Sequence, residues 1–370
     1  MKYYIIAGEA SGDLHASNLI KELKRLDTTS DFRCWGGDLM KDQGATLVMH
    51  LGDLAFMGFV EVLMNIRTII KKIKFCKRDI LQYKPDALIL VDYPGFNMRI
   101  AKFAKKAGIK VFYYISPQVW AWKQGRVHKI KKSVDRMFVI LPFEKDFYKR
   151  FDYDVDFVGH PLLDAVAGTS CKSNDADFRK EYEIGEKPVI AVLPGSRKQE
   201  IARMLPVMMN VVEKFPHYQF VVAGVRSLPA EYYNNLCKEY NVKLSFGNTY
   251  RLLTHAKAAL VTSGTATLET ALFGVPEVVC YKGSTVSFML AKKLVNIKYI
   301  SLVNLVMDKE VVKELIQQDF NSENLSKELS NILSDDRSIE MKNEFIRLKE
   351  MLGGEGASAK TAGLIMNLLR

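Results

Sequence analysis

The sequence predicts an α/β protein with two doubly wound domains and a helical C-terminal tail. Three observations lead to this prediction. The chain has 370 residues, and at roughly 150 residues per domain this length favours two domains. Short apolar runs alternate with helical patterns in both halves, as in doubly wound folds. A polar, aperiodic stretch at 164–187 separates the halves and is typical of a linker.

The first half, residues 1–163, predicts a Rossmann-like domain. The run ALILV at 87–91 is continuously apolar, as expected for a parallel strand covered on both faces. The expected strands are 3–7, 32–35, 46–49, 86–91, 111–115, 136–140 and 154–158. The expected helices are 13–25, 59–83, 96–107 and 126–133.

The same alternation resumes in residues 188–345 and predicts a second Rossmann-like domain. Its expected strands are 189–193, 219–223, 242–245, 259–261 and 277–281. From about residue 308 the pattern is mostly helical, and 346–370 is expected to be a helical segment that crosses back to the first domain.

The composition excludes several classes of protein. The five cysteines are far apart and lack zinc-site spacing, which favours reduced thiols in a reducing compartment. The apolar start at 3–7 is too short for a secretory signal, and no run approaches the roughly 18 apolar residues of a membrane span. We therefore expect a cytoplasmic protein that is not integral to a membrane. The net charge of +11 favours an anionic partner, which could be nucleic acid, anionic lipid or a phosphorylated substrate.

The loop LPGSR at 193–197 follows a strand and precedes a helix, where ligands of parallel sheets bind. Gly195 lets the backbone approach a ligand, and the free N–H groups there, including that of Ser196, suit a phosphate. Arg197 can add a charge-assisted contact. The alternative is a tight turn with a surface arginine.

A second loop of this kind, TSGTATLE at 262–269, also joins a strand to a helix. Ser263, Gly264 and Thr265 offer further backbone donors. Glu269 falls in the following helix, where it could accept from ribose hydroxyls or simply be solvated. Two such loops in one domain predict a nucleoside diphosphate held without a metal. The sequence has neither G-x-G-x-x-G nor G-x-x-x-x-G-K-[ST], which disfavours an NAD-binding protein and a P-loop NTPase.

Two loops of the first domain carry carboxylates. GEASGD at 8–13 contains Glu9 and Asp13, of which Asp13 could equally cap a helix. DYPGFN at 92–97 places Asp92 directly after an apolar strand. A half-shielded carboxylate there could take a proton from a hydroxyl, or could fix the turn before Pro94.

Two further signals carry less weight. DYDVD at 152–156 resembles a D-x-D metal motif, but alternating solvent-facing carboxylates at a strand explain it. His128 sits among lysines and arginines, as expected of a basic helix rather than of a catalytic base.

The segment 59–74 predicts an amphipathic helix with a basic flank. Such a helix packs on a core more often than on a membrane, but the cations at 67–78 favour an interfacial helix. We expect membrane or acyl-chain contact from the apolar stripe, which includes Phe59, Val62, Leu63, Ile66, Ile69 and Ile70.

Taken together, these loops resemble the lipid-A-disaccharide synthase family, whose members are glycosyltransferases of the GT-B fold. The matching segments are GEASGD (8–13), GFVEVL (58–63), DYPGFN (92–97), SPQVWAWKQGRV (116–127), LPFEKDFY (141–148), FVGHPL (157–162), LPGSRKQEI (193–201), SGTATLE (263–269) and YISLVNL (299–305). They run from end to end of the chain. Gln118 and Val303 stand where the family pattern leads us to expect Ser and Pro.

The resemblance implies two Rossmann-like domains that face a cleft and an inverting transfer between two lipid-like sugars. The donor would be UDP-2,3-diacylglucosamine and the acceptor 2,3-diacylglucosamine 1-phosphate, giving a β-1,6-linked disaccharide 1-phosphate and UDP. The family is peripheral on the inner face of the Gram-negative inner membrane and uses no metal; we expect no cofactor and no nucleic acid. Its members can form homodimers that exchange C-terminal segments, which the tail at 357–369 could serve.

On this hypothesis, Asp92 is the general base, with Glu9 as the other candidate. Arg197 and the amides of the two phosphate-type loops stabilise the leaving UDP. Glu269 holds the ribose and Asn304 contacts the donor. The acceptor or donor sugar is oriented by residues of the first domain, namely Ser11, Asp13 and Asn97.

Other functions remain open at this point. An isomerase similar to UDP-N-acetylglucosamine 2-epimerase would have the same fold but would need no lipid stripe and no acceptor. A non-catalytic sugar-nucleotide sensor at the membrane would keep the LPGSR and SGTATLE loops without needing Asp92 or Glu9. A nucleic-acid protein would suit the charge, but no recognised binding motif supports it.

Overall fold

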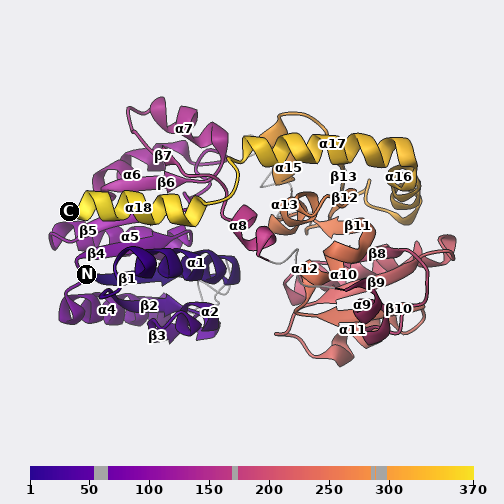
Figure 1. Ribbon diagram of the computed structural model, residues 1–370, viewed down its shortest axis with the longest axis horizontal. Helices are drawn as coiled ribbons and strands as arrows, with labels where there is room; N and C mark the ends of the chain where they lie inside the picture. Colours follow the sequence, from indigo (N-terminus) through magenta and orange to yellow (C-terminus); the bar gives the residue numbers. More distant parts are fainter. Residues whose placement is uncertain (54–65, 169–173, 285–287, 289–297) are drawn as a thin grey trace. The chain divides into compact units, whose positions relative to one another are not determined.

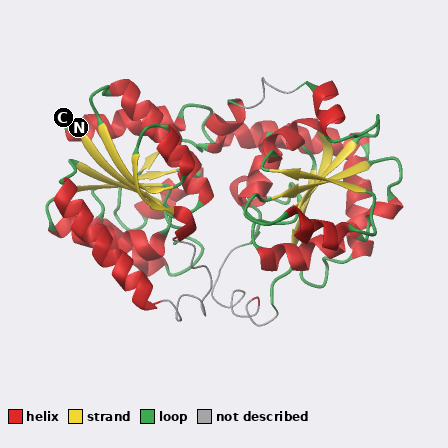
Figure 2. Ribbon diagram, turned by 90° about the horizontal axis from the view of Figure 1, so that it is seen from below, coloured by secondary structure: helices red, strands yellow, loops and turns green. Residues whose placement is uncertain are grey.

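The computed structural model divides the chain into two compact units. Unit 1 comprises Met1–Asp164 and Leu352–Arg370, and unit 2 comprises Ala165–Met351. The structure describes residues 1–53, 66–168, 174–284, 288 and 298–370. Each unit contains its own parallel sheet with helices on both faces (Figure 1, Figure 2).

Unit 1 is built on a seven-stranded sheet in the order β3-β2-β1-β4-β5-β6-β7. Its strands are β1 (Lys2–Ala7), β2 (Asp31–Gly36), β3 (Thr46–His50), β4 (Ala87–Val91), β5 (Lys110–Tyr114), β6 (Arg136–Val139) and β7 (Asp156–Phe157). Its helices are α1 (Ala10–Leu26), α2 (Asp38–Asp42), η1 (Leu51–Asp53), α4 (Ile66–Tyr83), α5 (Pro94–Lys106), η2 (Gln124–Arg126), α6 (Val127–Ser133), α7 (Pro142–Lys149) and α18 (Ala357–Leu369), while α8 (Leu162–Ala167) spans the boundary with unit 2.

Unit 2 is built on a six-stranded sheet in the order β10-β9-β8-β11-β12-β13. Its strands are β8 (Val189–Leu193), β9 (Gln219–Gly224), β10 (Val242–Phe246), β11 (Ala256–Thr262), β12 (Glu277–Tyr281) and β13 (Lys313–Ile316). Its helices are α9 (Asp175–Glu181), α10 (Lys198–Met209), η3 (Val212–Lys214), α11 (Ala230–Cys237), α12 (Thr249–His255), α13 (Thr265–Leu272), α15 (Leu302–Met307), α16 (Ser322–Leu333) and α17 (Asp335–Met351).

The apolar strands form because both faces of each sheet are covered. Every residue of β4 and of β8 is buried, which accounts for their continuous apolar sequences. Their neighbours β1 and β11 pair with them in parallel, with Ala7 opposite Val91 and Leu193 opposite Val261. The predicted fold class, two Rossmann-like doubly wound domains with a helical C-terminal segment, is confirmed.

Strand order reverses at one place in each sheet. In unit 1, β1 lies between β2 and β4, and in unit 2, β8 lies between β9 and β11. The connections that leave the carboxyl ends of β1 and β4 therefore run to opposite faces of the sheet, and so do those of β8 and β11. Ligands of open α/β sheets bind at this switch point.

The structure differs from the expected elements in three places. The strand expected at 154–158 is reduced to β7. The chain after 308 was expected to be helical, but it first forms the edge strand β13, paired in parallel with β12. Within the stretch expected to be a linker, α9 buries Phe178 in the core of unit 2.

The C-terminal helix α18 belongs to unit 1 and packs along α1 (Figure 1). Asp164 fixes its first turn, because its carboxylate accepts hydrogen bonds from the backbone N–H of Gly356 (2.6 Å) and Ser358 (3.0 Å). The thioether sulfur of Met366, further along α18, accepts a bond from the hydroxyl of Tyr3 on β1 at 3.0 Å.

Candidate functional site

In unit 1, the switch point brings together the two carboxylate-bearing loops. The loop 8–13 leaves β1 and the loop 92–97 leaves β4, and the two strands are neighbours. The loops approach closely: a Cβ atom on Gly8 would lie 2.3 Å from Cγ of Tyr93. Only glycine fits there, so this glycine allows the loop of Glu9 to lie against that of Asp92.

Asp92 is held in an unusual backbone conformation. Asp92 and Tyr93 have φ values of 45° and 49°, the left-handed region that L-residues with side chains rarely adopt. Its backbone carbonyl accepts hydrogen bonds from the hydroxyl of Tyr113 (2.5 Å) and the amide of Asn97 (2.7 Å). Its backbone N–H donates to the carbonyl of Tyr114 at 3.2 Å. Such strain concentrates at functional sites.

The carboxyl group of Asp92 is half-buried and titrates near neutrality. Burial, and then repulsion from Glu9, raises the pKa of Asp92 to about 7. A general base works best when its pKa lies near the working pH, because it is then ionised yet still basic. The pair can therefore accept a proton from a hydroxyl group.

The remaining predicted residues of these loops differ in their surroundings. Ser11 is half-buried in the first turn of α1. Asp13 is buried, and its carboxylate accepts from the backbone N–H of Gly37, Leu39 and Met40 at 2.8, 3.2 and 3.2 Å, so it fixes the start of α2. Asn97 is fully buried and donates to the carbonyls of Val91 and Asp92, so it holds the turn that presents Asp92.

In unit 2, the switch point brings together the two phosphate-type loops. LPGSR leaves β8 and TSGTATLE leaves β11, which are neighbouring strands. Gly195 has φ 114° and Gly264 has φ 156°, conformations that L side chains rarely adopt. Gly264 and Thr265 are exposed at the start of the eight-residue helix α13. Free N–H groups and the helix dipole favour an anion at such a position.

Glu200 is a residue of this site that sequence reasoning missed. Its carboxylate accepts from the backbone N–H of Ser196 (3.3 Å) and pairs with the guanidinium of Arg197 (3.0 Å). Both donors are those predicted to bind phosphate. Glu200 is the third residue of α10, after Arg197 at the N-cap, and a glutamate at that position commonly reaches back to the cap. That spacing is the signal that could have identified it.

Two other predicted residues have partners that were not foreseen. Glu269 accepts from the hydroxyl of Tyr250 at 2.8 Å, and burial raises the pKa of its carboxyl despite that bond. The hydroxyl of Ser263 donates to the carbonyl of Ile300 at 3.0 Å. No sequence pattern linked Tyr250 to Glu269, because they lie on different helices, α12 and α13.

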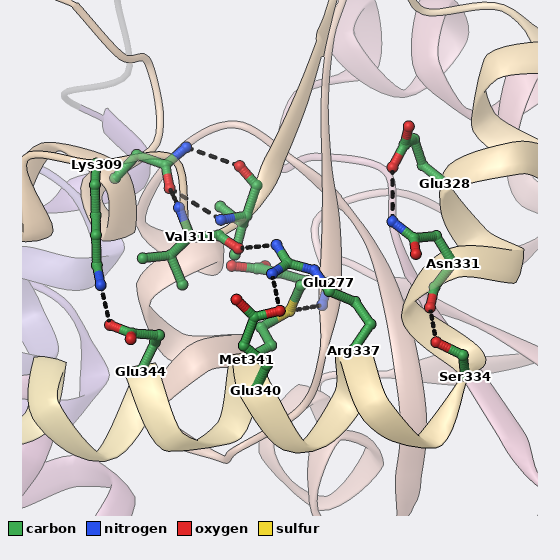
Figure 3. A network of polar contacts seen from close by, with 12 residues as sticks. Glu277, Lys309, Val311, Glu328, Asn331, Ser334, Arg337, Glu340, Met341 and Glu344 are labelled. Carbon is green, nitrogen blue, oxygen red and sulfur yellow. Dashed lines mark hydrogen bonds and ion pairs between the residues drawn. The ribbon is translucent and has the colours of Figure 1, made fainter.

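Asn304 is buried in α15, and all its amide hydrogen-bonding capacity is used inside the protein. Its Oδ1 accepts from the N–H of Val311 (2.8 Å) and Val312 (3.0 Å), and its Nδ2 donates to the carbonyl of Val312 (2.8 Å) and to Glu314 (3.0 Å). The segment 309–312 is tied in turn to α17 (Figure 3). Arg337 donates to the carbonyl of Val311 at 2.7 Å, and Lys309 pairs with Glu344 at 2.6 Å. Asn304 therefore holds the loop after α15.

The predicted apolar stripe lies only partly within the described residues. Phe59, Val62 and Leu63 lie outside them, and Ile66 is the first residue of α4. Ile69 packs against the core of unit 1, whereas Ile70 is 45% exposed. Of the stripe residues on α4, Ile70 is thus one that faces solvent.

In the part of the chain that the structure describes, no three His, Cys, Asp or Glu side chains are grouped so as to hold a metal ion. None of the helices within the same residues has the length and apolar character needed to cross a bilayer.

Comparison with known proteins decides the family. A family model described as lipid-A-disaccharide synthetase matches residues 3–365. The chain belongs to this family. The lipid-A-disaccharide synthase of Syntrophus aciditrophicus (strain SB) is 41% identical over 374 residues, which cover 99% of this chain and 97% of that protein. The synthase of Geobacter metallireducens (strain ATCC 53774 / DSM 7210 / GS-15) is 41% identical over 373 residues, with 99% and 96% covered.

Solved structures show that this member of the lipid-A-disaccharide synthetase family has the GT-B fold. A UDP-GlcNAc 2-epimerase from Neisseria meningitidis, bound to UDP-GlcNAc, matches with a TM-score of 0.68 at 14% identity, covering 100% of this chain and 99% of that one. The glycotransferase of kitacinnamycin matches with a TM-score of 0.69 at 15% identity and the same coverage. At these identities the likeness concerns the fold alone, so the epimerase alternative has structural similarity but no functional support.

Membership of the lipid-A-disaccharide synthetase family confirms the resemblance predicted from the motifs. The chain is an enzyme, a glycosyltransferase of lipid A biosynthesis, and its family function implies a UDP-sugar donor and a phosphosugar acceptor.

Proposed function

We propose that this chain joins UDP-2,3-diacylglucosamine to 2,3-diacylglucosamine 1-phosphate with inversion, giving the β-1,6-linked disaccharide 1-phosphate and UDP. The proposal depends on the functional groups that lie at the two switch points. One presents a carboxyl group with a pKa of about 7 beside a second carboxylate, and the other presents two glycine-containing loops with an arginine. Base and leaving-group stabiliser are the two parts that an inverting transfer needs.

In the proposed reaction, the carboxylate of Asp92 takes the proton of the acceptor 6-hydroxyl. The hydroxyl oxygen forms a bond to the anomeric carbon of the donor while the bond from that carbon to the UDP phosphate oxygen breaks. The transition state has oxocarbenium character, as in glycoside hydrolysis. Glu9 raises the basicity of Asp92, since its negative charge disfavours a second one nearby.

Negative charge develops on the departing UDP, and unit 2 supplies the hydrogen-bond donors and the positive charge that stabilise it. We assign the pyrophosphate to the backbone N–H groups of Gly195, Ser196, Gly264 and Thr265 and to the guanidinium of Arg197, which together replace a metal. Because Glu200 occupies the Ser196 amide and the Arg197 guanidinium, the pyrophosphate must displace its carboxylate. Glu269 is assigned to the ribose hydroxyls, and Ser263 and Asn304 to shaping the donor pocket from within.

Residues of unit 1 complete the acceptor side. Ser11 is assigned to a sugar hydroxyl. Asp13 and Asn97 are assigned to positioning the loops, because the Asp13 carboxylate accepts from backbone N–H groups and Nδ2 of Asn97 donates to backbone carbonyls. We further propose that unit 1 docks on the inner leaflet of the inner membrane through the apolar stripe. A homodimer with exchanged C-terminal segments is proposed for α18.

The deciding experiment incubates the pure protein with UDP-diacylglucosamine, with and without the monosaccharide phosphate, and analyses the products by mass spectrometry. We expect UDP and disaccharide 1-phosphate only when both substrates are present. Release or isomerisation of donor without acceptor would instead support an epimerase-like activity.

The base assignment is tested by Asp92→Asn, which keeps the size of the side chain but replaces the ionisable carboxyl group with a neutral amide. We expect turnover to fall by about 10²–10⁴-fold, the usual contribution of a general base, while UDP affinity measured by calorimetry stays unchanged. Near-normal turnover would remove the assignment, and the same measurement on Glu9→Gln separates the two carboxylates.

A further inference from the structure

The segment 116–126, here called the Trp122 loop, has no part in the chemistry proposed above. It follows β5, which pairs with β4 on the side away from β1. Its root lies beside Asp92, because the N–H of Asp92 donates to the carbonyl of Tyr114 at 3.2 Å. The loop thus starts at the edge of the sheet from which the proposed base projects.

The root of the loop is anchored by a buried carboxyl group. The hydroxyl of Ser116 donates a hydrogen bond to the carboxyl group of Glu144, a residue that is only 1% exposed. The other oxygen of Glu144 accepts from the N–H of Leu141 at 2.9 Å. Further along, the ring of Trp120 packs edge-on against Phe143 with centroids 5.0 Å apart. These contacts anchor the loop to α7 and the segment before it.

At the tip of the loop, the side chains of Lys123 and Arg126 both lie over the exposed ring of Trp122. Trp122 is 38% exposed. The ammonium nitrogen of Lys123 lies 4.6 Å from its ring centroid, and the guanidinium carbon of Arg126 lies 5.0 Å from it. Cation–π attraction holds both charges at the ring. Within the residues that the structure describes, neither cation forms an ion pair with a carboxylate, so two like charges are kept together unneutralised.

The sequence around the loop is also rich in basic residues. Between Asp92 and Asp135 the chain has ten Lys or Arg residues and no Asp or Glu. Opposite charges within 4–6 Å would be expected if the role were structural pairing. Lys105 has such a partner in Asp135, whereas Lys123 and Arg126 have none among the described residues, which favours an anionic ligand for these two.

We propose that Lys123 and Arg126, held on the ring of Trp122, bind the phosphate monoester of the acceptor. This inference rests on the proposed function, which supplies an acceptor with that group. A phosphate monoester carries a charge of about −1.5 to −2 near pH 7. A guanidinium contacts such a group through two parallel N–H bonds, and an ammonium adds a point charge. The site touches no reacting atom, so it selects phosphorylated over unphosphorylated acceptors.

The test measures binding of 2,3-diacylglucosamine 1-phosphate, and of the same lipid lacking the phosphate, in neutral detergent micelles. The double variant Lys123→Ala/Arg126→Ala is compared with Lys129→Ala/Lys132→Ala, which removes two exposed charges from the adjacent helix α6. We expect the first variant to bind the phosphorylated lipid about tenfold more weakly, with unchanged affinity for the other lipid, and the control to match wild type. Equal losses for both lipids, or for both variants, would overturn the proposal.

A second arm separates the acceptor phosphate from phosphate in lipid headgroups. Sedimentation with vesicles of phosphatidylglycerol and phosphatidylethanolamine should be the same for the Lys123→Ala/Arg126→Ala variant and the control. Lost vesicle binding with unchanged micelle affinity would assign the cations to the bilayer and contradict the proposal. If wild type forms no disaccharide, the proposed function fails, but lipid binding still decides whether this phosphate site exists.

Discussion

The surroundings of Asp92 raise the pKa of its carboxyl group to about 7, so its protonation changes near neutral pH. Its backbone lies in the left-handed region, its carbonyl is held by Tyr113 and Asn97, and its neighbour Glu9 adds a negative charge. No pattern in the sequence reports a φ angle or a repulsive neighbour. The sequence could identify the residue but not the property that suits it to be a base.

The pH dependence of transfer follows from this. With a pKa of about 7, Asp92 is protonated below that pH and cannot act as a base, so kcat/KM should fall about tenfold per pH unit there. Glu9→Gln removes the repulsion, lowers the pKa of Asp92 and should move the inflection to lower pH. Rate profiles with the exposed Asp154→Asn as control check this. An inflection that stays in place in Glu9→Gln would show that Glu9 does not set the pKa of Asp92.

Glu200 predicts an unusual response of nucleotide binding. In the structure its carboxylate accepts hydrogen bonds from the Ser196 amide and the Arg197 guanidinium. A pyrophosphate must compete with this carboxylate for the same donors. Glu200→Gln keeps the shape but removes the charge, so UDP should bind severalfold more tightly by calorimetry. Arg197→Ala should weaken UDP binding, since it removes a charge-assisted bond.

The control for this prediction is Glu213→Gln, which removes an exposed carboxylate elsewhere in unit 2. It should leave UDP affinity unchanged. Weaker UDP binding in Glu200→Gln would mean that the carboxylate organises the loop more than it competes with the ligand.

Among the elements, the docking of α18 depends on one carboxylate from a distant part of the chain. Asp164 caps its first turn through the N–H groups of Gly356 and Ser358. Removing such a cap usually costs about 1 kcal/mol. Asp164→Ala should therefore speed amide hydrogen exchange in 357–369 more than in the sheet strands, as measured by mass spectrometry.

Asp154→Ala is the matched control, since it removes an exposed carboxylate close by in the sequence. Exchange in α18 should be the same as in wild type. A uniform change across both units in Asp164→Ala would show that the residue supports global stability rather than the docking of this helix.

The elements also show why some of the fold could be predicted and some could not. Strands such as β4 are buried on both faces, and their apolar runs identify them without ambiguity. The edge strand β13 has the sequence KELI with one of four residues buried, so neither continuous burial nor clean alternation marks it. Its position depends on pairing with β12, which is tertiary information.

At the scale of the whole molecule, the doubly wound order explains why loops from distant sequence positions meet. Residues 8–13 and 92–97 come together because β1 and β4 are neighbours, and 193–197 and 262–269 do so because β8 and β11 are. Strand alternation and loop position therefore predicted both groups of residues. The burial of Asn304 could not be predicted, since its partners at 311–314 are fixed by a loop and an edge strand.

Membrane docking also concerns the whole molecule, and among the stripe residues the structure favours Ile70 as the one to mutate. Ile69 packs on the core, so its replacement would disturb folding, but Ile70 is 45% exposed. Ile70→Asp should reduce sedimentation with anionic vesicles, because burying a charge in lipid is unfavourable. Ile339→Asp, at an exposed isoleucine of unit 2, should not. Equal sedimentation of the two variants would contradict docking through this stripe.

The split of unit 1 around unit 2 has a consequence for biosynthesis. Unit 1 needs residues 352–370 as well as 1–164, and α18 covers α1. On the ribosome, the seven-stranded sheet emerges long before the helix that shields one of its flanking helices. The surface of α1 that receives α18 must then stay uncovered during synthesis of all of unit 2. We expect the nascent first unit to be a chaperone client until translation ends.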